Sequence, residues 1–213
     1  FRLAAPPPGF IDDPYPFYAA LREHAPYHAL APQTWLMTRY DDVAAVYRHA
    51  AASSDKQREF GPKFGVGTPL FEHHTTSLVF NDAPLHTRVR RLLMGALNQR
   101  AIARMEAGVT ALVESLLDEM QARGTHADLI GDFAARIPVE VIGNLLDVPH
   151  AERAPLRNWS LAILSALEPA PSAAVLDRGH TAVREFVDAL DHLVQRRRAV
   201  PGDPQADVLT RLI

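Results

Sequence analysis

The chain has 213 residues, of which 47% are hydrophobic and 22% charged, enough for one sizeable core or for a piece of a larger domain. A net charge of −3 gives no electrostatic reason to expect nucleic acid or an anionic membrane as a partner. The apolar runs are too short for a membrane span, and no charged-then-apolar leader opens the chain. Because the sequence has no cysteine, disulfides and thiolate metal ligands are excluded within these residues, and we expect a cytoplasmic protein.

Three elements are predicted in the first fifty residues. A helical pattern runs over Asp13–His24, with a proline in its first turn. Two short alternating runs, Tyr27–Leu30 and Thr34–Thr38, predict a β-hairpin. Asp41 or Asp42 is the expected N-cap of the helix that follows.

The segment from Ala51 to Asn81 has no clear helical or strand period, and glycines and prolines interrupt it. Loops of this length are uncommon inside a compact domain and usually serve a function. Its scattered apolar residues argue against disorder, so we predict an ordered binding loop over residues 51–81. Within it, His73 and His74 suggest a zinc site, but no third well-spaced ligand follows, which favours structural packing.

From residue 84 onward, apolar residues recur every three or four positions, which predicts helices. The predicted helices are Pro84–Leu97, Ala101–Arg123, Asp132–Asp147 with a kink at Pro138, His150–Leu167 and Ser172–Arg198. The fold class is therefore mainly α with a small β hairpin. A last helix, capped by Asp207, would reach residue 213 with its apolar stripe still running, and the chain opens without a methionine. We expect a fragment, with a frayed natural terminus as the alternative.

The helix predicted over residues 84–97 carries the most informative pattern. On a helical wheel, Leu85, Val89, Leu92 and Ala96 form the stripe expected to be buried. His86 and Arg90 are four residues apart and share a face beside that stripe. Arg88 and Arg91 point the other way, so Arg90 is the arginine expected to face the interior.

A half-buried Arg90 requires an anion, because an unpaired guanidinium costs several kcal/mol, on the order of 3–5, to bury. No acid lies four residues away on its face. Arg and His both suit a carboxylate-bearing ligand, since Arg can bind it with two parallel hydrogen bonds. The alternative is an internal pair with a distant Glu or Asp, with His86 a satisfied histidine at the edge of the core.

The run Asn81–Arg91 (NDAPLHTRVRR) resembles the segment that opens helix C in bacterial cytochromes P-450. Four further segments are similar to that family in order and spacing: Asp13–Arg22, Tyr40–Val43, Phe133–Pro149 and Gly202–Ile213. The resemblance implies the amino-terminal part of a haem monooxygenase, with helices A to the start of H. It also implies that His86 and Arg90 bind the propionates of haem. Ala83 departs from the family, which usually has a second proline there.

The resemblance further implies a substrate lid over residues 51–81. Ser77, Leu78 and Val79 are the candidates there for substrate contact, and Leu164, with Leu161 and Leu167, is a candidate from the helix at 150–167. Plain core packing is the alternative for the leucines. The expected substrate is a small hydrophobic molecule, oxidised with O2.

The resemblance implies electrons from a ferredoxin or flavin reductase, or from a fused reductase domain. The fused subgroup is suggested by the run Glu72–Phe80. The family's axial cysteine is absent from this chain, so we expect these residues alone to be inactive.

Two rival hypotheses remain from the sequence. In the first, the chain is a helical ligand-binding module in which His86 and Arg90 hold a small carboxylate. In the second, it is a helical scaffold in which Arg90 pairs internally. Neither rival predicts that haem is bound.

Overall fold

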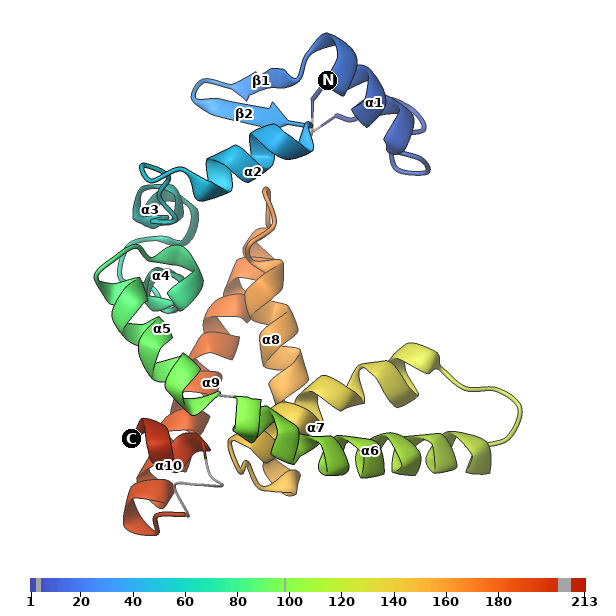
Figure 1. The fold of residues 1–213 in the computed structure, drawn as a ribbon, viewed down its shortest axis with the longest axis vertical. Helices are drawn as coiled ribbons and strands as arrows, with labels where there is room; N and C mark the ends of the chain where they lie inside the picture. The colour runs from blue at the N-terminus through green and yellow to red at the C-terminus, as the bar shows by residue number, and fades with distance from the viewer. Residues whose placement is uncertain (3–4, 98, 203–207) are drawn as a thin grey trace. The chain divides into compact units, whose positions relative to one another are not determined.

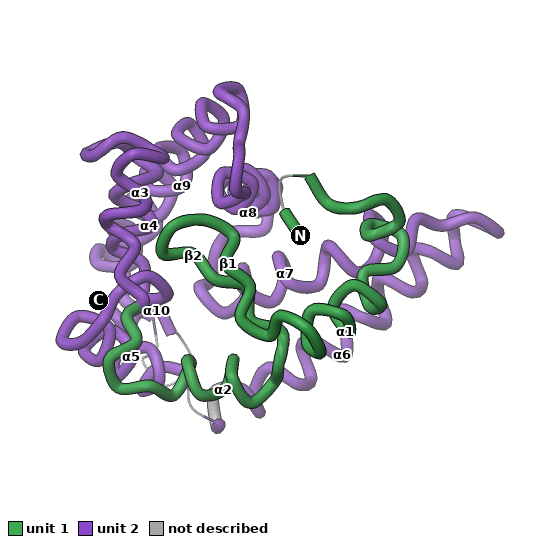
Figure 2. Tube along the Cα trace, turned by 90° about the horizontal axis from the view of Figure 1, so that it is seen from above, with its two compact units in different colours: residues 1–53 green, residues 54–213 purple. Residues whose placement is uncertain are grey.

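The computed structural model describes residues 1–2, 5–97, 99–202 and 208–213 (Figure 1). The described chain is mainly helical with one two-stranded antiparallel sheet, which confirms the predicted fold class. It divides into two compact units, residues 1–53 and 54–213, which Figure 2 shows in separate colours.

The first unit contains the predicted hairpin. Strands β1 (Tyr27–Ala31) and β2 (Thr34–Met37) pair antiparallel, with Tyr27 opposite Met37. Helix α1 spans Tyr15–His24 and α2 spans Tyr40–Arg48. The predicted cap of α2 is wrong by two or three residues, because Arg39 is the N-cap and Asp41 and Asp42 lie in the first turn. Carboxylates are still favourable there, since the helix dipole is positive at that end.

The prediction of an irregular loop over residues 51–81 is wrong. Two short helices, α3 (Gln57–Phe64) and α4 (Pro69–Thr76), and a 3-10 turn, η1 (Leu78–Phe80), occupy most of it. Each helix has only two turns, too few for a wide window to show a period. The local signals are nevertheless present, because Thr68 caps α4 by accepting a hydrogen bond from the Phe71 N–H.

The second unit continues with five longer helices and three short ones. They are α5 (Leu85–Ala96), α6 (Gln99–Ala122), the π-helical turn η2 (Leu129–Ala134), α7 (Arg136–Leu145), the 3-10 turn η3 (His150–Glu152), α8 (Leu156–Ser165), α9 (Ala173–Ala199) and α10 (Val208–Leu212). The predicted cap of the last helix, Asp207, lies outside the described residues. None of the helices in the described ranges is both long and apolar enough to cross a membrane.

Two predicted helices are divided in the structure. The helix predicted over Asp132–Asp147 changes from η2 to α7 before Pro138, so the predicted kink is replaced by a break at Ala135. Pro138 then lies in the first turn of α7, where its missing N–H leaves no hydrogen bond unmade. The helix predicted over His150–Leu167 is interrupted ahead of Pro155, the N-cap residue of α8.

The main core of the second unit lies where α3, α4, α8 and α9 meet. Its buried apolar side chains are Phe60, Phe64, Leu70, Ile163, Ala166, Ala182 and Val183. Helices α8 and α9 lie side by side (Figure 1), and Gly179 of α9 allows the close approach of Leu70, whose side chain is fully buried. The segment predicted as a loop therefore supplies three of these seven buried core residues.

Polar contacts tie the same helices together. The amine of Lys63 donates to the carbonyls of Leu167 (2.9 Å) and Glu168 (2.6 Å) just beyond the C-terminal end of α8. The backbone N–H of Leu70 donates to His180 Nδ1 of α9. These bonds fix α3 and α4 against the α8–α9 pair.

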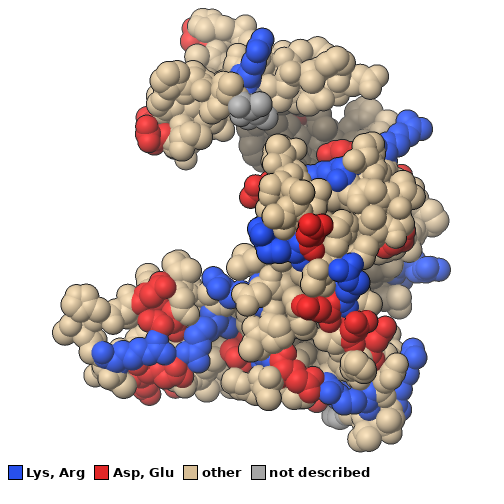
Figure 3. All heavy atoms as spheres, turned by 180° about the vertical axis from the view of Figure 1, so that it is seen from behind, with Lys and Arg blue, Asp and Glu red and all other residues tan. Residues whose placement is uncertain are grey.

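Surface ion pairs join α6 and the residue after it to α7 and η2. Arg136 of α7 binds Glu119 of α6 at 2.5 Å, and Arg123 pairs with Asp132. Figure 3 shows acidic and basic side chains next to one another over these helices. The mixed signs match the small net charge and give no single-sign patch there.

Candidate functional site

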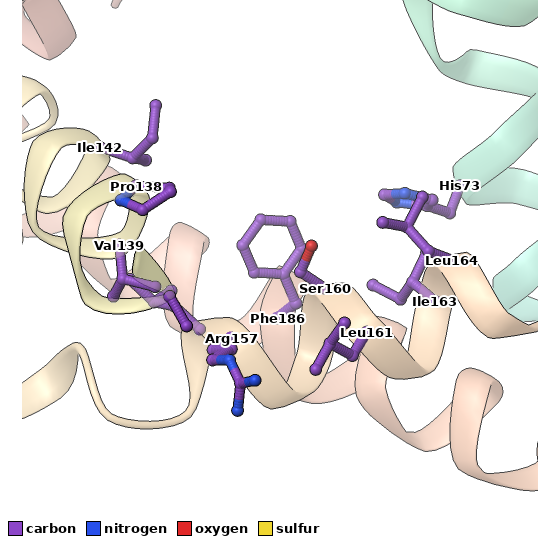
Figure 4. Close-up of a pocket in the computed structure, with 12 residues that line it drawn as sticks. His73, Pro138, Val139, Ile142, Arg157, Ser160, Leu161, Ile163, Leu164 and Phe186 are labelled. Atoms are coloured by element: carbon purple, nitrogen blue, oxygen red, sulfur yellow. The ribbon is translucent and has the colours of Figure 1, made fainter. Parts of the chain in front are cut away.

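A cavity of about 460 Å³ opens between α7, α8 and α9, with His73 of α4 at one side (Figure 4). Most of the lining is apolar. The apolar lining residues are Ala135, Pro138, Val139, Ile142, Leu156, Leu161, Ile163, Leu164 and Phe186. A concave, largely apolar pocket of this volume suits a small organic molecule.

One face of α8 supplies much of this lining. Arg157, Ser160, Leu161 and Leu164 follow the spacing i, i+3, i+4, i+7, which places them on a single side of the helix. Leu164 is 57% exposed and Leu161 49% exposed, so these leucines are not core residues of the described chain. Of the predicted contact residues, Leu161 and Leu164 line the cavity, whereas Leu167 packs against the core.

The other predicted substrate contacts lie elsewhere. Ser77 is the N-cap of η1 and accepts a hydrogen bond from the Val79 N–H. Leu78 is half-buried and Val79 is 68% exposed. None of the three is among the residues that line the cavity, so the structure does not bring them together with Leu164.

His73 reaches the cavity because its neighbour anchors α4 in the core. The ring of His74 is buried and surrounded by Phe60, Phe64 and Phe80, with ring centroids 5.3–5.7 Å away. Burial, reinforced by the nearby His73 and Lys63, lowers the pKa of His74 to about 4. A neutral imidazole therefore packs inside the core, as the structural interpretation of the histidine pair predicts.

Sequence reasoning predicted only Leu161 and Leu164 of this lining and missed the other ten described residues, among them His73, Ile142, Ser160 and Phe186. The signal on α8 was available, since Ser160 is one residue from Leu161 and one turn from Leu164. No pattern within a single helix could show that α4, α7 and α9 meet there.

Helix α5 carries the predicted anion-binding pair. It packs against η1 and α10. In the described residues, the side chains of His86 and Arg90 have no hydrogen-bond or ion-pair partner, and an acid-free run from Ala83 to Met105 surrounds them in the sequence. The predicted burial of Arg90 is wrong, because it is exposed; His86 is half-buried.

The apolar stripe of α5 is also less buried than predicted. Ala96 is buried, but Leu92 is 62% exposed. Pro84 is the N-cap residue of α5, and the Asp82 carboxylate accepts a hydrogen bond from the Ser54 N–H. The wheel gave the right neighbours on the helix but could not show what packs against each face.

In sequence and fold the chain is similar to bacterial cytochromes P450. It is 34% identical to 6-deoxyerythronolide B hydroxylase of Saccharopolyspora erythraea over 96% of the chain and 51% of that protein. It is 30% identical to the cytochrome P450 monooxygenase PikC of Streptomyces venezuelae, over 95% of the chain and 47% of that protein. Among solved structures, CalO2 shares the fold with a TM-score of 0.83 and 30% identity, over 97% of the chain and 51% of CalO2.

The chain spans about half the length of the curated relatives it matches. A scan against protein-family models gave no match. Cytochromes P450 use haem, an iron porphyrin that carries two propionate carboxylates.

The residues on α5 fit such a group. Within the described part of the chain, His86 and Arg90 present donors without a partner, four residues apart on one helix face, and no acid from Ala83 to Met105 competes for them. A guanidinium binds a carboxylate through parallel N–H···O bonds, and an imidazole adds one more donor.

Proposed function

We propose that the chain is the amino-terminal part of a haem-dependent monooxygenase that inserts one oxygen atom of O2 into a small hydrophobic substrate. The similarity to cytochromes P450 over nearly the whole chain carries this proposal. Several relatives are named as hydroxylases, which supports the reaction type. Electrons would come from a ferredoxin or flavin reductase, or from a fused reductase domain, in the cytoplasm.

In this proposal His86 and Arg90 bind the haem propionates. Each charge-assisted hydrogen bond contributes about 1.5–3 kcal/mol. The bound haem with a cysteine thiolate would supply oxygen activation. Because these 213 residues contain no cysteine, the thiolate must come from outside them.

The cavity between α7, α8 and α9 serves as part of the substrate pocket, with Leu161 and Leu164 in its lining. Ser77, Leu78 and Val79 are proposed to approach the substrate or the haem edge from the segment before α5. The role of residues 51–81 is to cover the site, as two short helices rather than as an irregular lid.

The full-length protein with both His86→Ala and Arg90→Ala tests the propionate assignment. We expect the double variant to lose most of its haem during gel filtration, measured as the ratio of Soret to protein absorbance. The matched control is Arg88→Ala with Arg91→Ala, which removes two exposed arginines from the same helix and should retain haem. Equal haem content in both double variants would remove the assignment.

A second measurement tests the inactivity of these residues alone. Residues 1–213 supplied with haem, reduced and exposed to carbon monoxide, should not show the Soret band of a thiolate complex. Appearance of that band would contradict the requirement for an external cysteine. Absence of haem from the full-length protein would instead favour a helical module that holds a small carboxylate.

A further inference from the structure

The cavity between α7, α8 and α9 has three polar residues in its apolar lining: His73, Arg157 and Ser160. Polar groups in such a pocket fix the orientation of a ligand and select its chemistry. Their charge and direction therefore indicate which molecules the pocket accepts.

Among the described residues that line this cavity, Arg157 is the one charged side chain, and its guanidinium points away from the cavity. Figure 4 shows it directed away from Ile142, Phe186 and His73. The same residue also lines a neighbouring, more polar cavity that contains Glu140. The aliphatic part of the Arg157 side chain thus lines the apolar cavity, while its charged guanidinium points away from that cavity.

His73 presents a neutral imidazole to the cavity. Burial lowers the pKa of His73 from its ordinary value of 6.5, so the ring is uncharged at neutral pH and offers one N–H donor and one acceptor. Within the described ranges its ring nitrogens have no hydrogen-bond partner. The ring of His74, 5.1 Å away and enclosed by phenylalanines, holds this part of α4 in place.

Ser160 is the second neutral polar group. Its hydroxyl lies beside the Phe186 ring in Figure 4, and the described chain supplies no hydrogen-bond partner for it. Phe186 packs in turn on Trp159, with ring centroids 6.0 Å apart. This contact between Phe186 of α9 and Trp159 of α8 holds the helix that carries the Ser160 hydroxyl in place.

We propose that the substrate is an uncharged, mostly apolar molecule with at least one hydroxyl or carbonyl oxygen, which His73 and Ser160 bind and thereby orient. This inference rests on the proposed function of the cavity as a substrate pocket. A carboxylate is disfavoured, because its desolvation in an apolar wall would have to be offset by two neutral groups alone. A pure hydrocarbon is disfavoured too, because it would leave both polar groups without a partner.

The test uses the full-length protein and three matched probes: 4-cyclohexylcyclohexanol, bicyclohexyl and 4-cyclohexylcyclohexanecarboxylate. Dissociation constants are measured by isothermal titration calorimetry at neutral pH. We expect the alcohol to bind more tightly than either of the other probes. His73→Phe and Ser160→Ala should each raise the dissociation constant of the alcohol by about 3- to 10-fold. The dissociation constant of bicyclohexyl should change by less than about 2-fold in both variants.

Arg157→Met is the matched control, since it keeps the aliphatic stem and removes the charge. This variant should bind the alcohol with the same dissociation constant as the parent protein. Preferred binding of the carboxylate, with loss of that preference in Arg157→Met, would overturn the proposal. Equal binding of alcohol and hydrocarbon, or unchanged alcohol affinity in both His73→Phe and Ser160→Ala, would overturn it as well.

Haem content is read separately, from the absorbance of the same samples. A protein that lacks haem but selects the alcohol through His73 and Ser160 would refute the monooxygenase and support the pocket. A protein that binds haem, but whose affinity for the alcohol is unchanged by both substitutions, would support the monooxygenase and refute the proposed roles of His73 and Ser160.

Discussion

Replacing His74 by phenylalanine should make the stability of the protein less sensitive to acid. The His74 ring is 3% exposed and stacks on Phe64 with its centroid 5.3 Å away. Its Nε2 is buried without a hydrogen-bond partner in the described part of the chain. Protonation would place a charge among three aromatic rings beside His73 and Lys63.

The size of the effect follows from the two pKa values. The pKa of His74 is about 4 in the folded protein and about 6.5 in an unfolded chain. Between these values the unfolded chain binds more protons, so stability falls as the pH falls from about 6.5 to about 4. The difference corresponds to about 3 kcal/mol in the free energy of unfolding.

Urea unfolding at pH 7 and pH 4 measures this loss. Trp159 lies against the same core, and a Trp35→Phe background makes it the single fluorescent reporter, since the chain has two tryptophans. We expect the parent to lose about 3 kcal/mol more than His74→Phe between the two pH values. Residual loss is expected in the variant, because burial also lowers the pKa of His73 and of His180.

His126→Gln is the control, because it removes an exposed histidine and should leave the pH dependence of the parent unchanged. If the parent and His74→Phe lose the same stability within about 1 kcal/mol, His74 is not a buried neutral base, and the reasoning is refuted.

Four further substitutions test the packing of the second unit by urea unfolding. Leu70→Ala, at a fully buried side chain, should cost about 3 kcal/mol; a loss below about 1 kcal/mol would contradict its place in the core. Gly143→Ala should cost about 1–3 kcal/mol, because the new Cβ would stand 2.5 Å from Arg153 Nε, and an unchanged stability would show that Arg153 can move aside. Glu140→Gln should cost about 2–4 kcal/mol, since Glu140 is 2.6 Å from the buried Arg153. Glu119→Gln, at the exposed pair with Arg136, should cost clearly less, because solvent screens that pair.

The long helices were predictable because their signals are local. Helix α9 follows its predicted bounds to within a residue, with Ser172 as N-cap, and the hairpin follows from its alternating runs. Apolar spacing repeated over several turns, with a capping residue at the start, leaves few alternatives for the backbone.

The short helices were not predictable in the same way. Helices α3 and α4 each have eight residues, and an isolated helix of that length is unstable in water. They form because Phe60, Phe64 and Leu70 are buried against α8 and α9, more than ninety residues further along the chain. Tertiary packing decided their structure.

By itself, the sequence determined the helix that places His86 and Arg90 on one face, because four residues complete roughly one turn of a helix. It also put Leu161 and Leu164 on a common side of α8. Only the tertiary structure decided that Leu164, Ser160 and His73 share a cavity, because their meeting depends on how α4, α7 and α9 pack around α8. Spacing along a helix is fixed by backbone geometry, whereas the contacts between helices depend on side chains far apart in the sequence.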